Sequence, residues 1–303
     1  MILRLLCLAA LVWGAADPAR AQGLLDDKPR TAVVTAYEPE IKLLLARTSV
    51  EATHAVNGVT FTTGKLGGRD VVVFLSGISM VNAAMNAQLA LDRFNVGEIV
   101  FSGIAGGVDP DLRIGDVVVA ERWGQYLEAV YARETPAGLK APPFAKTDFP
   151  PFGMAIPQPV RVRSASRPAG ESRFWFDADP RLLDLARGIA AAARLERCAQ
   201  GNACLQDPPR LVVGGNGVSG QAFVGNAAFR EYTFKTFGAR VLDMETAAVA
   251  TVAYANGKPF IAFRSLSDLA GGGPAENEIG TFFQLAADNS ARVVIAFLEA
   301  LGR

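Results

Sequence analysis

The chain has 303 residues, half of them hydrophobic, which is enough for one large core or at most two modest ones. Its 30 basic and 30 acidic residues cancel to a formal net charge of zero. A neutral chain lacks the positive charge that attracts nucleic acid or an acidic membrane surface, so the composition favours a small, mostly uncharged ligand.

The first 21 residues have the layout of a secretory signal peptide. A short apolar run over residues 5–16 follows one positive charge, and the pattern A-x-A over residues 19–21 marks a cleavage site. The apolar run is too short for a permanent membrane span. We therefore expect residues 1–21 to be removed and the mature chain to be secreted into the periplasm without a stable membrane anchor. An uncleaved N-terminal anchor is the alternative.

Two cysteines remain after this leader, Cys198 and Cys204, in the polar segment RCAQGNACLQ. Their close spacing in a polar loop of an exported protein favours a disulfide, which would close a small loop and stabilise the fold only locally. A pair of free thiols is the alternative. Because His54 is the only histidine and lies far from both cysteines in sequence, we expect no metal site, and we expect no cofactor.

From residue 31 onwards, short apolar runs alternate with longer helical patterns. Each apolar run is continuous in Val, Ile and Phe, which is typical of strands in a sheet that is covered on both faces. The sequence therefore predicts a single α/β domain over residues 22–303. The predicted strands span residues 31–35, 59–63, 71–75, 98–101, 116–120, 211–213 and 260–263, and the predicted helices span 39–46, 81–94, 180–195, 226–237, 244–254 and 282–301.

One segment departs from this alternation. Residues 131–179 are rich in Pro, Phe, Arg and Ala, contain APPF and DFPPFG, and show no clear period. We interpret them as a long surface excursion without a core of its own, within an insertion over about residues 128–209. Loops of this length are usually functional lids or disordered segments. An ordered arm that packs on the surface or on a partner subunit is the alternative.

Polar groups follow apolar strands at four places, which is where open α/β sheets bind ligands. In TAYEPE, Pro39 makes Glu40 an early helical residue, and a helix N-terminus keeps a carboxylate ionised, as suits a base that holds a water. Ordinary charge complementing the helix dipole is the alternative. In SGIAGGV, the glycines 103, 106 and 107 let the backbone turn sharply and approach a ligand, with a purely structural turn as the alternative.

The other two places put carboxylates at strand ends. In VLDMETAAVATVA, Glu245 starts a helix of small apolar residues, where a ribose diol would supply two hydroxyl donors to it. The alternative is helix capping by Asp243 or Glu245. In FIAFRSLSDLAGGG, Asp268 follows a strongly apolar strand, and a partly desolvated carboxyl there suits a general acid. The alternative is an Asp turn or cap before a loop.

Together and in this order, these segments resemble the nucleoside phosphorylase superfamily, and most of all its 5'-methylthioadenosine/S-adenosylhomocysteine nucleosidase branch. The resemblance covers residues 31–127 and 211–300, and it includes SGISMVNAA over residues 76–84 and SGQAFV over residues 219–224. SGIAGGV with IGDVVV, and DMET with RSLSD, are its most specific parts. It implies a three-layer α/β/α fold with a central mixed sheet, a homo-oligomer (a dimer or larger), and hydrolysis of the N-glycosidic bond of a purine nucleoside.

The resemblance also implies roles for single residues. Glu40 corresponds to the glutamate that activates the attacking water, and Glu38 replaces it if Pro39 shifts the register. Glu245 corresponds to the glutamate that holds the ribose 2'- and 3'-hydroxyls, and Asp268 to the aspartate that protonates N7 of the purine. The implied substrate-binding residues are Ser76, Gly77, Ile78, Ala105 and Gly106 along the sugar, Met244 against it, Phe223 and Val224 at the base, and Ser267 beside the acid.

The nucleophile is the sharpest question that the sequence addresses. Phosphorylases of this superfamily bind phosphate with arginines, one in the first strand–helix turn and one before the Gly-rich loop. This chain has TAYEPE at the first place and residues 99–101, IVF, at the second, and Glu38 and Glu40 would repel a phosphate dianion. We therefore expect a hydrolase. A phosphate-dependent phosphorylase, or a secreted nucleoside- or base-binding protein without catalysis, is the alternative.

Two departures leave the base and the 5'-group open. Gln221 stands where the family often has an acidic residue, and the loop GGGPAEN over residues 271–277 is unusual.

Overall fold

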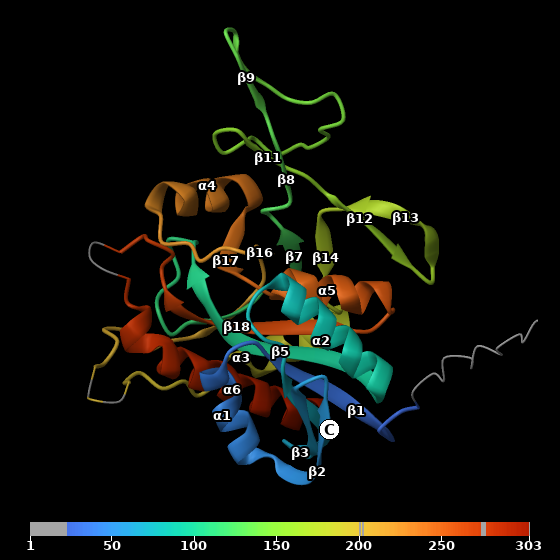
Figure 1. The fold of residues 1–303 in the computed structure, drawn as a ribbon. Helices are drawn as coiled ribbons and strands as arrows, with labels where there is room; N and C mark the ends of the chain where they lie inside the picture. Colours follow the sequence, from blue (N-terminus) through green and yellow to red (C-terminus); the bar gives the residue numbers. More distant parts are fainter. Residues whose placement is uncertain (1–22, 200, 202, 274–276, 303) are drawn as a thin grey trace, which may run out of the picture.

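The computed structural model describes residues 23–302 apart from 200, 202 and 274–276, and the signal peptide predicted for residues 1–21 lies outside the described residues. The chain forms one twelve-stranded mixed sheet with helices on both of its faces (Figure 1). The strands of the sheet are β1 (Asp26–Thr35), β2 (Ser49–Val56), β3 (Val59–Leu66), β4 (Arg69–Leu75), β5 (Phe94–Gly107), β6 (Val117–Val119), β7 (Arg122–Gln125), β14 (Trp175–Asp177), β15 (Leu211–Val213), β16 (Asn216–Ser219), β17 (Ala239–Asp243) and β18 (Phe260–Asp268).

The centre of the sheet is parallel. β5 pairs in parallel with β1 on one side and with β18 on the other, and β1 continues in parallel to β4. All nine residues of β18 are buried, as the continuous apolar runs predict for strands covered on both faces. β17 pairs antiparallel with the end of β5, and β3 pairs antiparallel with both β2 and β4, so the sheet is mixed.

Helices form the two outer layers. α1 (Glu38–Arg47) and α3 (Pro180–Ala190) both contact α6 (Ile279–Leu301) over one face, and α2 (Met80–Arg93) and α5 (Thr246–Ala255) pack together over the other (Figure 1). α4 (Ala227–Phe237) packs beside β17. Two large apolar clusters separate these helices from the sheet, one on each face. The predicted three-layer α/β/α fold with a central mixed sheet is confirmed.

The predicted elements are present, but several bounds differ and five strands of the sheet were not predicted. These strands lack the apolar run on which the prediction depended, because β2 is mostly exposed and the other four are short: β7, β14, β16 and β17. The helix predicted over residues 180–195 ends at Ala190. Beyond it, the buried amide of Asn289 on α6 accepts the N–H of Glu196 at 2.7 Å and donates to its carbonyl at 2.9 Å, which holds the chain outside a helix.

Most of the segment over residues 131–179 is an ordered arm of hairpins, and its last strand, β14, belongs to the central sheet. β8 (Ala129–Tyr131) pairs with β11 (Ala155–Pro157), β9 (Arg133–Thr135) with β10 (Gly138–Lys140), and β12 (Val160–Ser164) with β13 (Arg167–Arg173). The β8–β11 part extends away from the sheet, while β12 and β13 lie close to α5 (Figure 1). The rings of Phe149 and Phe174 pack at 4.9 and 5.4 Å from that of Phe237 and so fix the base of the arm.

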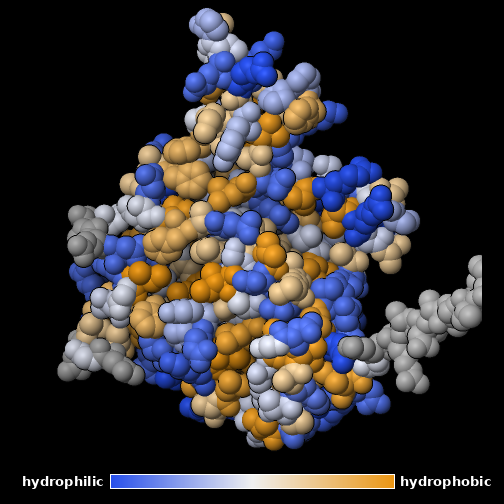
Figure 2. Space-filling view, in the orientation of Figure 1, coloured by the Kyte–Doolittle hydropathy of each residue, from blue (hydrophilic) through white to orange (hydrophobic). Residues whose placement is uncertain are grey.

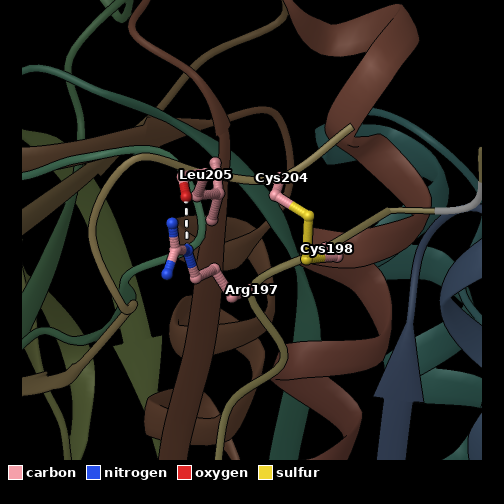
Figure 3. The surroundings of a disulfide bond; sticks show 4 residues. All are labelled: Arg197, Cys198, Cys204 and Leu205. Atoms are coloured by element: carbon pink, nitrogen blue, oxygen red, sulfur yellow. Dashed lines mark hydrogen bonds between the residues drawn. A yellow bond between two sulfur atoms is a disulfide. The ribbon is translucent and has the colours of Figure 1, made fainter. Parts of the chain in front are cut away.

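Cys198 and Cys204 form a disulfide in the loop between α3 and β15 (Figure 3). Beside it, Nε of Arg197 donates a hydrogen bond to the carbonyl of Leu205 at 2.6 Å. Leu205 packs with Ile114 and Leu285, so this small loop is attached to the body of the domain. Among the described residues, no helix combines the length and the apolar composition that a membrane crossing requires.

Candidate active site

The three predicted catalytic carboxylates line one cavity of about 340 Å³. Glu40 follows β1, Glu245 follows β17, and Asp268 ends β18, so three segments distant in sequence meet at the ends of strands. The end of β5, residues 104–106, forms a further part of the wall. The lining residues are Ala36, Tyr37, Glu40, Ile78, Ile104, Ala105, Gly106, Ala222, Phe223, Val224, Leu242, Asp243, Met244, Glu245, Ser267, Asp268 and Ile279.

Three backbone N–H groups hold the Glu40 carboxylate in the cavity wall. Its Oε2 accepts from the N–H groups of Ala36 at 2.8 Å and Tyr37 at 2.9 Å, and its Oε1 accepts from that of Ile104 at 2.8 Å. The side chain is only 2% exposed because it turns back under the first turn of α1. Glu38 is exposed and does not line the cavity, so the register places Glu40, and not Glu38, in this position.

Asp243 caps α5 and thereby leaves the Glu245 carboxylate available to a ligand. Oδ1 of Asp243 accepts from the N–H groups of Glu245 and Thr246, both at 3.2 Å, and from the hydroxyl of Ser219 at 2.5 Å. Glu245 makes no capping bond to its own helix. It is 5% exposed, and its Oε1 accepts from the N–H of Ser79 at 2.8 Å. Capping therefore falls to Asp243, and the Glu245 carboxylate makes no bond to its own helix.

Ser79 holds Glu245 at a cost in backbone strain. Its φ of 80° and ψ of 157° lie in a region that glycine adopts readily and other residues rarely do. The strained turn points the Ser79 N–H at Glu245, so the strain is associated directly with the site.

The guanidinium of Arg264 lies buried between the carboxylates. Its Nε is 2.8 Å from Oδ2 of Asp243, one terminal nitrogen is 3.4 Å from Oε2 of Glu245, and the other is 3.9 Å from Oε1 of Glu40. It also stacks 4.1 Å from the ring centroid of Phe101. Arg264 does not line the cavity, and its nitrogens are already engaged by neighbouring side chains.

One guanidinium among three carboxylates leaves an excess of negative charge in a buried place. Burial raises the pKa of Glu245 to about 7, although Arg264 acts in the opposite direction. Burial also raises the pKa of Glu40, opposed by Arg264 and by the three N–H groups that favour its charged form. Such a site is suited to stabilising positive charge that develops on a bound ligand.

Asp268 is 3% exposed and is hydrogen bonded at both carboxyl oxygens. Oδ1 accepts from the N–H of Ala270 at 2.8 Å and from the side-chain amide of Asn277 at 3.2 Å. Oδ2 accepts from the hydroxyl of Ser267 at 3.0 Å. The bond from Ala270 is the turn contact expected in the alternative interpretation, and the same carboxyl nevertheless lines the cavity.

Most of the implied substrate-binding residues line the cavity, but Ser76 and Gly77 do not. Ser76 is fully buried, its N–H donates to the carbonyl of Thr35 at 2.6 Å, and its own carbonyl accepts from the amide of Asn86 at 2.7 Å. Gly77 supplies a φ of 80° to the same turn. These two residues hold the connection between β4 and α2, which brings Ile78 and Ser79 to the site.

Several residues of the cavity wall have no site role predicted from the sequence. Tyr37 and Ile104 lie inside the motifs TAYEPE and SGIAGGV, so their positions were visible although their roles were not. Ile279 begins α6 three residues before the predicted start of that helix, and no pattern in the sequence marked it. The lining residues not assigned to the site are Ala36, Tyr37, Ile104, Ala222, Leu242, Asp243 and Ile279.

The chain is similar in sequence to proteins of a known family. Residues 30–299 match the family model described as Phosphorylase superfamily. A 5'-methylthioadenosine/S-adenosylhomocysteine nucleosidase of Geobacillus thermodenitrificans is 31% identical over 283 residues, which cover 90% of this chain and 97% of that protein. A nucleosidase of the same name from Psychromonas ingrahamii is 28% identical, and the match covers 89% of this chain and 98% of that protein.

Solved structures show the same similarity. The nucleosidase of Neisseria meningitidis in complex with methylthio-immucillin-A is 25% identical, with a TM-score of 0.67. The match covers 89% of this chain and 98% of that structure's chain. The nucleosidase of Colwellia psychrerythraea in complex with adenine is 27% identical, with a TM-score of 0.67 and coverages of 90% and 95%.

Proposed function

The chain belongs to the phosphorylase superfamily, and from that premise we propose that it hydrolyses the N-glycosidic bond of a purine nucleoside of the methylthioadenosine or S-adenosylhomocysteine type. The products are the free base and the ribose moiety. One observation carries the proposal: Glu40, Glu245 and Asp268, from three distant segments, line a single cavity together with the aromatic ring of Phe223.

The chemistry follows from where these side chains lie. Asp268 gives a proton to N7 of the purine, Glu40 takes a proton from the attacking water, and Glu245 accepts hydrogen bonds from the ribose hydroxyls. The bond between C1' and the base breaks as the water oxygen bonds to C1'. Positive charge develops on the sugar, and the excess of carboxylates around Arg264 stabilises it.

Two features favour water over phosphate as the nucleophile. Among the described residues that line the cavity, none has a basic side chain. The nearby cation, Arg264, is buried and already paired with Asp243 and Glu245. A phosphate dianion would therefore meet carboxylates with no free positive charge to offset the repulsion.

The test is release of free base from adenosine, inosine, methylthioadenosine and uridine, with and without phosphate. We expect release from methylthioadenosine without phosphate and no increase when phosphate is added. Strict dependence on phosphate would identify a phosphorylase instead. Tight binding of adenine without release of base from any of these nucleosides would identify a binding protein.

We further propose that the chain is exported to the periplasm, with the Cys198–Cys204 disulfide formed there. The A-x-A pattern after an apolar run and the paired cysteines support this proposal. Cell fractionation and N-terminal sequencing of the mature protein test it: a cytoplasmic protein that retains residues 1–21 would contradict it.

We propose in addition that the chain forms a homo-oligomer. Ile78 and Phe223 line the cavity yet are 46% and 59% exposed, and Val81 and Met85 of α2 are exposed as well. Figure 2 shows hydrophobic residues, interspersed with hydrophilic ones, on the face that carries α2 and α4. A second subunit over this face would cover them. Light scattering of the purified protein measures the assembly, and a monomer at micromolar concentration would contradict the proposal.

A further inference from the structure

The side chain of Asn277 connects the carboxyl of Asp268 to the start of α6. Its Oδ1 accepts a hydrogen bond from the N–H of Ile279 at 2.9 Å, and its Nδ2 lies 3.2 Å from Oδ1 of Asp268. A backbone N–H cannot bond to the NH₂ end of an amide, so the contact with Ile279 fixes which end of the amide faces which neighbour. Asn277 therefore presents a donor, and not an acceptor, to Asp268.

The two oxygens of Asp268 consequently differ. Oδ1 receives two donors that cannot reverse, the N–H of Ala270 and the amide of Asn277. Oδ2 receives the hydroxyl of Ser267 at 3.0 Å, and the same hydroxyl lies 3.3 Å from the carbonyl of Ala105. A hydroxyl has one hydrogen and rotates freely, so Ser267 donates to Ala105 when Oδ2 carries a proton and to Oδ2 when it does not.

We propose that Asn277 is a positioning residue that keeps Oδ1 of Asp268 an acceptor, so that the proton given to the purine is carried on Oδ2. The inference rests on the proposed function. In the reaction, the Oδ2–H bond breaks and N7 gains the proton while the C1'–base bond breaks. Asp268 is left as a carboxylate, and the Ser267 hydroxyl turns from Ala105 towards Oδ2. Glu40 ends the reaction with the proton that it took from water, and Asp268 ends without its own. Glu40 then releases its proton to solvent and Asp268 takes one from solvent, so both side chains return to their starting states.

The placement of Asn277 allows a test that separates positioning from folding. Asn277 is exposed and lies outside the apolar clusters, so substitution there leaves the core intact. Its two hydrogen bonds are also separable, because one atom bonds Ile279 and another bonds Asp268.

Three variants use this separation. Asn277→Ser keeps an oxygen able to accept from the Ile279 N–H but lacks the amide NH₂ group, one bond further from the backbone, that donates to Asp268. Asn277→Ala loses both contacts. Asn277→Asp keeps the contact with Ile279 and turns a carboxylate oxygen towards Oδ1 of Asp268. Glu278→Gln, at the exposed neighbouring position, is the matched control.

We expect Asn277→Ser and Asn277→Ala to lower kcat by about 10-fold, with KM changed less than about 3-fold, because a donor to a carboxylate is lost in both. Asn277→Asp lowers kcat further, because a proton shared between the facing carboxylates sits on the wrong oxygen of Asp268. It also moves the alkaline limb of the kcat pH profile upwards, because a second carboxylate favours the protonated acid. Glu278→Gln retains the kcat and pH profile of the unsubstituted protein.

A purely structural role would give a different result. Asn277→Ser would then behave like the unsubstituted protein, and the pH profile would stay the same in all variants; either finding overturns the inference. Calorimetric binding of adenine separates this failure from failure of the proposed function, since it needs no hydrolysis. A protein that binds adenine without releasing base contradicts the proposed function alone, and weaker adenine binding by Asn277→Ser then still supports the contact with Asp268.

Discussion

The cavity wall and the arm over residues 131–179 place their polar groups in opposite ways. In the wall, Glu40, Glu245 and Asp268 are almost fully buried, and backbone N–H groups of neighbouring turns hold each of them. In the arm, the charged side chains are mainly exposed, and aromatic rings at its base attach it to the body. Hydrogen bonds hold the individual carboxyl oxygens of the wall in place, whereas the aromatic contacts of the arm hold only the segment as a whole. We therefore expect catalysis to depend on the wall and to be nearly independent of the outer arm.

The largest expected effect comes from removing one charge in the wall. Glu40→Gln should lower kcat by about 10²–10⁴-fold, because the amide cannot take the proton from water. Glu38→Gln is a matched control, since Glu38 is two residues away on the same helix but exposed. Steady-state release of base measures both. Equal activity of the two variants would contradict the role of Glu40 and the contrast between buried and exposed carboxylates.

A second effect concerns stability and pH. Burial raises the pKa of Glu245 to about 7 from an ordinary value of 4.5. Between these two values the folded chain keeps a proton that the unfolded chain loses, so the free energy of unfolding should fall as pH rises from about 4.5 to 7, by up to about 3 kcal/mol. Denaturant titrations across this range measure the slope.

The matching variant tests the assignment to Glu245. Glu245→Gln has no proton to lose, so its free energy of unfolding should fall less over the same range. An identical pH dependence in the variant and the unsubstituted protein would assign the effect to other groups.

A smaller effect is expected where the wall stores strain. Ser79→Gly should raise the free energy of unfolding by about 1 kcal/mol, because relief of the φ of 80° exceeds the added entropy of the unfolded chain. The N–H that Glu245 accepts is kept, so kcat should change little. Thermal unfolding measures the stability. A destabilised variant would mean that the Ser79 hydroxyl contact with Gln221, at 3.3 Å, outweighs the strain.

The smallest effect belongs to the outer arm. β9 and β10 pair through three residues each and are largely exposed. Replacing residues 134–139 by an Asn-Gly turn keeps Arg133 and Lys140 opposite one another, and kcat/KM and the free energy of unfolding should stay within about twofold and ~0.5 kcal/mol of the original values. A large loss of activity with unchanged stability would show that the arm contributes to the site.

Sequence patterns predicted most of the fold and the three carboxylates that line the cavity because both depend on short-range features. Continuous apolar runs mark buried strands, as in β18, and an acidic residue after such a run marks a strand end, as with Asp268. The exposed edge strand β2 and the short strands β16 and β17 lacked such a run, so the prediction missed them.

The sequence by itself determined the α/β alternation, the motifs and the identity of three carboxylates. Only the tertiary structure decided that Asp243 caps α5 while Glu245 stays available, that Arg264 lies among three carboxylates, and that Asn277 bonds Asp268. The physical reason is that capping, charge balance and amide orientation depend on distances between atoms from separate segments. Those distances are set by packing the helices on the sheet, and no local pattern of residue types contains them.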